Sequence, residues 1–131
     1  MSAFQALRQW AATSTIAHVG FGFLAMGGWA VFANRDHTLP EMLIAGLVQG
    51  TISGLLTLGL KKFLEWFNAK LAGLAALIVP PLVTASSILA ILLSAHTLAG
   101  TPEIFATIAV PFTVSTSYAI IYNWGLWRRR A

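Results

Sequence analysis

The sequence has no cysteine and very little charge. Only eight basic and four acidic side chains occur in 131 residues, so 9% of the chain is charged, against ~25% in average soluble domains. Without cysteine the chain has no disulfide, no thiolate nucleophile and no cysteine-ligated metal. Because 57% of its residues are hydrophobic, the composition excludes an ordinary soluble domain and indicates a protein that lies in a lipid bilayer.

The few basic residues also argue against a nucleic-acid partner. The sequence pI is near 10.2, but the lysines and arginines lie at the ends of apolar runs, where membrane anchors lie, and do not form a surface that follows phosphates. The apolar run after Arg8 is about twice the ~7–15 residues of a signal-peptide core, so we expect it to persist as a span. Membrane lipids are therefore the expected partners.

Four apolar runs predict an all-α integral membrane bundle of four transmembrane helices in one domain, 1–131. The spans are expected at about residues 10–33, 42–60, 71–95 and 103–122. A run as long as the second makes a helix of ~28 Å, close to the ~30 Å hydrocarbon core of a bilayer. Residues 1–9 form a short, weakly amphipathic lead-in, and Trp10 and Trp29 mark the two ends of the first span.

The segments that precede the second and fourth spans carry helix-start signals. Pro40 with Glu41, and Thr101 with Pro102 and Glu103, place a proline and an acid in the first turn, and Thr101 is the expected cap. The two glutamates are either helix-start acids or, by their related positions, a paired binding site.

Three prolines, Pro80, Pro81 and Pro111, are expected to kink the third and fourth spans. Pro80 and Pro81 remove two backbone donors and leave the carbonyls of Ala76 and Leu77 without helical partners, so a kink or a break is expected there. In lipid those carbonyls need internal partners or water.

The distribution of basic residues predicts the orientation. With four spans, seven basic residues share one side and only Arg35 lies on the other; the seven are Arg8, Lys61, Lys62, Lys70, Arg128, Arg129 and Arg130. By the positive-inside rule both termini face the cytoplasm. The predicted location is the bacterial inner membrane, with a multi-pass topology.

The sequence also contains a candidate internal repeat. His37-Thr38-Leu39-Pro40-Glu41 is echoed by His96-Thr97-Leu98, followed three residues later by Pro102-Glu103. Identities among the residues that flank these motifs could arise by chance, but the paired His-Thr-Leu and Pro-Glu motifs favour duplication. The prediction is two tandem helical hairpins, which would be parallel repeats because each has an even number of spans.

Glycines 46, 50 and 54 recur every fourth residue in the second span. This small-residue spacing lets membrane helices approach closely. The ridge of Gly46, Gly50 and Gly54 is expected to pack helices within the repeat or between subunits. We therefore expect a homo-oligomer or a subunit that has a partner in the membrane.

No catalytic motif is present. Apart from Glu103 at the first position of the fourth span, no acidic, lysine or arginine side chain lies within a predicted span, and the three histidines lack the spacing of a metal cluster. No Gly-x-Ser-x-Gly turn accompanies the serines. We expect no enzyme, no cofactor and no metal site.

The polar residues inside the spans are the candidates for a substrate site. His18 is the ionisable group deepest in a span, and it either serves function or hydrogen-bonds a neighbour as a neutral imidazole. Gln49 needs partners because it carries a primary amide. The polar residues of the spans either line a cavity or pack helices. Packing is possible without a cavity because Ser and Thr can bond to their own helix carbonyls. The candidates are His18, Gln49, Ser53, Thr84, Ser87, Thr113 and Ser117.

The carboxyl-terminal cluster Arg128, Arg129 and Arg130 is either a topology anchor or a contact with anionic lipid head groups or a lipid diphosphate. Just before it, Tyr122-Asn123-Trp124 through Arg128 loosely matches an asparagine–aromatic–arginine ending that is absent at Lys61 to Trp66. In layout, over the whole chain, the protein resembles the GtrA-like family of small, basic, four-span proteins, whose even-numbered spans end in that pattern. The resemblance implies cytoplasmic termini and a role in moving polyprenyl-phosphate-linked sugars.

Three functional hypotheses follow. The first is a transport or flippase-type protein or subunit that handles a lipid-linked or small polar substrate. The second is an accessory or assembly subunit of a larger membrane complex. The third is a pore-forming oligomer.

Overall fold

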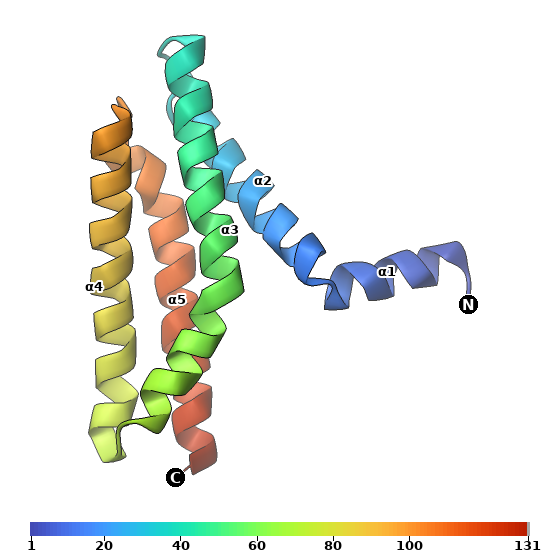
Figure 1. The fold of residues 1–131 in the computed structure, drawn as a ribbon, viewed down its shortest axis with the longest axis vertical. Coiled ribbons are helices and arrows are strands. Elements are labelled where there is room, and N and C mark those ends of the chain that lie inside the picture. Colours follow the sequence, from blue (N-terminus) through green and yellow to red (C-terminus); the bar gives the residue numbers. More distant parts are fainter. Residues whose placement is uncertain (131) are drawn as a thin grey trace.

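The structure, a computed structural model, describes residues 1–130 and is built from five α-helices within that range (Figure 1). They are α1 (Ala3–Thr13), α2 (Thr15–Ala33), α3 (Leu39–Ala69), α4 (Gly73–Ala99) and α5 (Ile104–Arg130). Four of them, α2 to α5, are long and apolar enough to cross a membrane. The predicted all-α class and the four apolar helices are therefore confirmed.

The first span differs from the prediction because the helix breaks at Ser14. The Ser14 backbone is extended, with φ −74° and ψ 125°, and its N–H donates to the Trp10 carbonyl at the end of α1. Its hydroxyl accepts from the Ala17 N–H at 3.3 Å, so Ser14 also begins α2, as serine often does at helix N-termini. Trp10 consequently lies in α1, and the first membrane-length helix begins at Thr15.

The glycine ridge packs α3 against α2 of the same chain. A Cβ on Gly46 would lie 2.6 Å from the Val31 Cγ2, and one on Gly50 would lie 3.0 Å from the Phe23 carbonyl oxygen. On the α2 side, a Cβ on Gly27 would lie 2.9 Å from the Gly46 carbonyl oxygen. These separations are shorter than normal carbon contacts, so the helices can approach this closely only because the residues are glycines.

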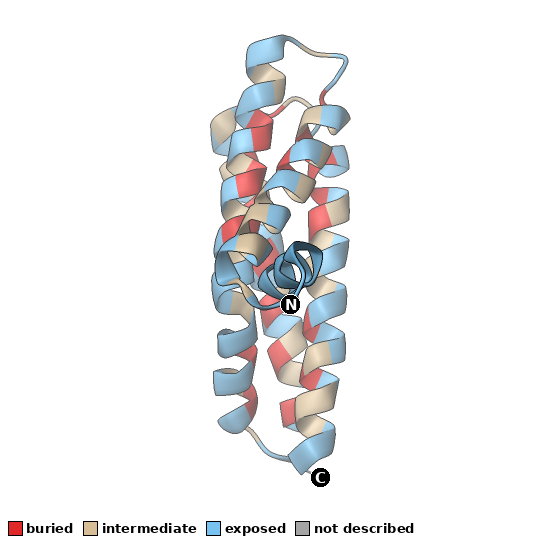
Figure 2. Ribbon diagram, turned by 90° about the vertical axis from the view of Figure 1, so that its right-hand side faces the viewer, coloured by how far each residue is buried: buried red, intermediate tan, exposed pale blue. Residues whose placement is uncertain are grey.

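Helices α3, α4 and α5 form the compact part of the molecule. Its centre is Ile88, Leu92 and Ile108, and α3 adds Ile52 and Leu56. Figure 2 shows the buried residues in rows along the inner faces, with exposed residues outside. Most large apolar side chains lie on those outer faces, as they do in a protein whose surroundings are lipid.

Helix α2 packs along α3 but stands apart from α4 (Figure 1). Its carboxyl-terminal part also reaches α5. The Trp29 Nε1–H donates to the Ala106 carbonyl at 2.9 Å near the start of α5. The amino-terminal half of α2 then leans away from α5.

The prolines do not break their helices. Helix α4 runs unbroken from Gly73 to Ala99 through Pro80 and Pro81, and α5 continues through Pro111. The freed carbonyls have internal partners, as the sequence argument required: the Asn123 amide donates to Leu77 O at 2.9 Å and to Ala76 O at 3.0 Å.

The two helix starts are built differently. Thr38 caps α3 and forms a reciprocal capping box with Glu41, so the role of Glu41 as a helix-start acid is confirmed. Thr101 does not cap α5, because its hydroxyl bonds His96 instead. The N–H of Glu103, one residue before α5, donates to the Asn34 side chain at 3.0 Å. The tandem repeat stays a prediction.

Candidate functional site

The most buried polar cluster joins α3 to the end of α4. The Gln49 Oε1 lies 2.9 Å from His96 Nε2, and the Gln49 amide donates to the Ser53 hydroxyl at 3.0 Å. On the other side of the ring, His96 Nδ1 lies 2.8 Å from Thr101 Oγ1. His96 and Gln49 are both 0% exposed.

The chemistry of this cluster follows from its donors and acceptors. An amide oxygen can only accept, so His96 Nε2 carries the proton that faces Gln49. A neutral ring then leaves Nδ1 to accept from the Thr101 hydroxyl. Every polar group of the cluster therefore has a partner, which is what burial in an apolar surrounding demands. The cluster therefore holds α3 to the end of α4.

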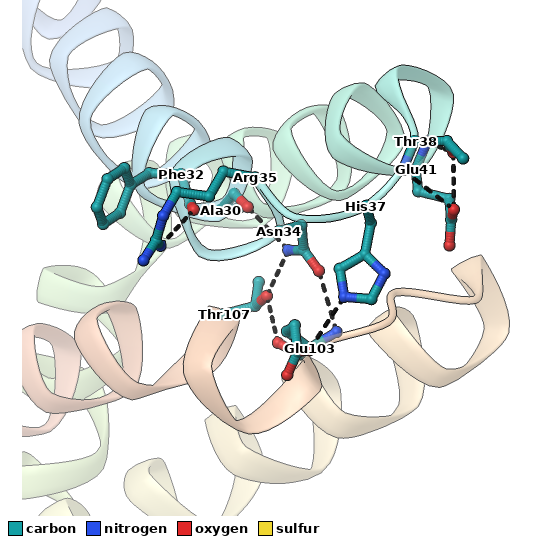
Figure 3. Close-up of polar contacts among 9 residues, drawn as sticks. All are labelled: Ala30, Phe32, Asn34, Arg35, His37, Thr38, Glu41, Glu103 and Thr107. Carbon is teal, nitrogen blue, oxygen red and sulfur yellow. Dashed lines mark hydrogen bonds and ion pairs between the residues drawn. The ribbon is translucent and has the colours of Figure 1, made fainter.

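A second cluster ties the α2–α3 loop to the α4–α5 connection (Figure 3). The Asn34 amide donates to Ala30 O and to Thr107 Oγ1, each at 2.8 Å, and its oxygen accepts from the Glu103 N–H. Beside it, the His37 Nε2 lies 3.0 Å from the Glu103 Oε1. Asn34 is fully buried, whereas half of the Glu103 side chain is exposed. Glu41 bonds Thr38 instead, so a paired site of the two glutamates stays a prediction.

A third cluster lies at the opposite end of the bundle. The Asn68 amide donates to Asn123 Oδ1 and to Ala76 O, both at 2.9 Å. The Arg130 guanidinium donates to Asn68 Oδ1 at 2.6 Å and to Leu71 O at 2.8 Å. Arg130 therefore locks the α3–α4 connection and is not free for a lipid head group.

The other two arginines of the carboxyl-terminal cluster are more available. Arg128 stacks over the Trp124 ring at 4.7 Å, and Arg129 donates to the Gly125 carbonyl of its own helix. Both side chains lie on the exposed surface. Between α3 and α5 the Tyr122 hydroxyl donates to Glu65, whose carboxylate is 4.0 Å from Lys61.

The structure does not gather the sequence-predicted candidates into one cavity. Gln49, Ser53 and Thr84 are buried, and Thr84 is the one among them whose hydroxyl has no partner. The remaining four lie on exposed helix faces: His18, Ser87, Thr113 and Ser117. His18 has no side-chain hydrogen bond within residues 1–130 of the structure.

Two hollows lie on the surface of the described chain. One is an apolar groove of about 480 Å³ beside α2; it is lined by Thr15, Ile16, Val19, Gly20, Phe23, Leu24 and Leu58. Another, of about 430 Å³, lies near the carboxyl-terminal end of α4 and is lined by Leu93, Ser94, Thr97 and Leu98. Across residues 1–130 no three His, Asp or Glu side chains come together in a way that could hold a metal ion.

Sequence reasoning missed four residues that organise the bundle: Asn34, Asn68, His96 and Asn123. Three are asparagines: Asn34 and Asn68 lie at the ends of α2 and α3, and that position was the available signal, whereas Asn123 lies inside α5. The fourth lies one residue beyond the predicted end of the third span. Comparison with known proteins gives no match of this chain to a family model, a curated protein or a solved structure.

Proposed function

We propose that this chain is a non-enzymatic subunit of a membrane transport assembly that handles a lipid-linked or small polar substrate. We further propose that the substrate path lies between chains. The observation that carries this proposal is that, within residues 1–130, the buried polar side chains other than the Thr84 and Thr116 hydroxyls are already bonded to one another or to backbone groups, so a single bundle leaves no continuous polar path.

The buried clusters support the second half of the proposal. Gln49, one of the sequence-predicted candidates for a substrate contact, donates its amide N–H to Ser53 and accepts from His96 through its oxygen. Opening this cluster to a substrate would leave buried groups unpaired, at about 1–3 kcal/mol for each group. A path inside one chain would therefore have to disrupt the contacts that hold α3 to α4.

The exposed position of His18 on α2 supports a path between chains. Only 11% of the apolar stretch of α2 is buried inside the chain, and His18 lies on the exposed surface of this helix. An ionisable side chain that faces lipid is costly, and such residues usually face a protein interior or a water-filled cavity. A second protein surface against this face would give His18 that surrounding.

The test combines cross-linking with flux. Because the chain has no cysteine, His18→Cys and Phe105→Cys each introduce a single thiol; Phe105 is 80% exposed on α5 and is the matched control. We expect thiol cross-linking in native membranes to trap a partner or a second copy through position 18 and not through position 105. Transport is then read in proteoliposomes that contain the assembly purified with His18 intact, with a fluorescent anionic phospholipid as the probe.

His18→Leu should abolish translocation of that probe while the protein remains folded and assembled. A chain that is monomeric in native membranes and still translocates the probe would refute the path between chains. An assembly that forms through position 18 but moves nothing, with or without the His18 change, would refute transport.

That last outcome would favour the second candidate, an accessory subunit whose α2 surface binds a partner helix. The same limited burial of α2 supports it. This candidate predicts that Gly50→Leu, which displaces Phe23 and with it α2, abolishes co-purification of the partner, whereas His18→Leu has no effect.

A further inference from the structure

Helix α1 has two chemically distinct faces. At 100° per residue, Phe4, Leu7 and Trp10 lie on one arc of the helix, and Gln5, Arg8 and Gln9 lie on the opposite arc. The helix is properly capped, because the Ser2 hydroxyl accepts from the Gln5 N–H while the Gln5 side chain accepts from the Ser2 N–H. The sequence therefore specifies an independent amphipathic helix that is separate from α2.

The apolar face of α1 is not covered by the chain. Phe4, Leu7 and Trp10 are 68%, 60% and 52% exposed, and no residue of the helix is buried. Figure 1 shows α1 lying across the long axis of the bundle and touching only the start of α2. Something outside the described chain must remove these three side chains from water.

The position of α1 identifies what covers it. Gly27 lies beside Gly46 and Val19 lies beside Gly54, so eight residues back along α2 correspond to eight residues forward along α3. Five more residues in the same directions place Ser14 near Gly59, which lies just before Lys61 and Lys62. The α1–α2 hinge is thus level with the charged end of the apolar part of α3, where an apolar helix meets the membrane surface.

Charge gives the chemistry of that surface. Arg8 lies at the edge of the polar face, with its guanidinium 5.9 Å from the Phe4 ring centre. No acidic residue precedes Asp36 in the sequence, so Arg8 gives α1 its one charged side chain, and that charge is positive. Basic amphipathic helices with aromatic apolar faces bind anionic bilayers in the interface plane.

We propose that α1 is an in-plane helix that binds the surface of an anionic lipid bilayer. Phe4, Leu7 and Trp10 enter the head-group region, and Arg8 contacts lipid phosphates. This inference rests on the membrane placement of α2 to α5 and not on transport, so the two proposals fail separately.

Spin labels on single cysteines test the proposal in the full chain. Phe4→Cys and Leu7→Cys label the apolar face, and Gln5→Cys and Gln9→Cys are the matched controls on the polar face. The protein is placed in vesicles of phosphatidylcholine with phosphatidylglycerol. We expect labels 4 and 7 to be several-fold more accessible to oxygen than to a water-soluble nickel chelate, and labels 5 and 9 to show the reverse.

Three outcomes would overturn the proposal. Equal nickel accessibility at all four labels would place α1 in water, and a steady increase in depth from residue 4 to residue 9 would make it part of the span. Protection from both probes at labels 4 and 7 would indicate a protein partner. The charge is tested by Arg8→Glu, which should raise nickel accessibility at label 7 several-fold in anionic vesicles and little in pure phosphatidylcholine; equal behaviour in both lipids would exclude anionic recognition.

Discussion

Replacement of Asn123 by leucine tests whether side chains compensate for the two prolines of α4. Asn123 is fully buried and is the side chain that bonds Leu77 O, the carbonyl freed by Pro81. Ala76 O, freed by Pro80, keeps a second partner in Asn68. The change therefore leaves one carbonyl unpaired, and it also removes the Oδ1 acceptor of Asn68.

The magnitude follows from counting those groups. Each unpaired polar group costs about 1–3 kcal/mol, so Asn123→Leu should destabilise the protein by about 2–6 kcal/mol. Pro81→Ala restores a backbone N–H that can reach Leu77 O within the helix. In that background the cost of Asn123→Leu should fall by about 1–2 kcal/mol, above the ~0.6 kcal/mol average for hydrogen bonds between membrane helices.

Pro80→Ala is the matched control. It restores a donor to Ala76 O, which Asn68 already satisfies, so it should reduce the cost of Asn123→Leu much less than Pro81→Ala does. Unfolding free energies of all single and double variants can be measured by titration with sodium dodecyl sulfate in mixed micelles, followed by circular dichroism. Equal costs of Asn123→Leu in the wild-type, Pro80→Ala and Pro81→Ala backgrounds, within about 0.5 kcal/mol, would refute the reasoning.

Two further predictions use the same unfolding assay. Gly27→Ala should lower stability because its Cβ would lie 2.9 Å from the Gly46 carbonyl oxygen, whereas the adjacent Gly28→Ala, with nothing within 4 Å, should be neutral or slightly stabilising; equal effects would mean that the α2–α3 contact is looser than described. Gln49→Leu should cost about 1–3 kcal/mol, because His96 Nε2 loses its acceptor, while His18→Leu should leave stability unchanged; a silent Gln49→Leu would show that the buried cluster contributes nothing.

The helix content and the apolar runs could be predicted from the sequence because hydrophobicity and length decide them locally. The break at Ser14 could not. A serine inside an apolar run can bond back to its own helix or cap a new one, and the choice depends on where the membrane surface lies. The same ambiguity let Trp10 be assigned to the span.

The polar partners could not be predicted because they are tertiary contacts. The sequence showed that Ala76 O and Leu77 O would need donors, yet nothing local indicated that Asn68 and Asn123 supply them from 8 and 46 residues away. That His18 is exposed and His96 is buried could not be predicted for the same reason. Depth along a span can be counted from sequence, but which helix face lies inward depends on the neighbouring helices.

Hydrogen bonding of buried side chains is least complete in the middle of the α4–α5 pair. The hydroxyls of Thr84 and Thr116 are buried and lack hydrogen-bond partners in the structure. Asn123 lies beside Ala76. Thr84 is eight residues after Ala76 in α4 and Thr116 is seven residues before Asn123 in α5, so the two threonines lie at about the same depth. If no ligand or water occupies this level, Thr84→Val removes an unpaired group and should be neutral or stabilising. Thr107→Val is the control and should destabilise by about 1–3 kcal/mol, because the Thr107 hydroxyl joins Asn34 to Glu103 O. A loss at Thr84 as large as that at Thr107 would show that the hydroxyl has a partner, and a polar molecule would then lie at mid-depth between α4 and α5.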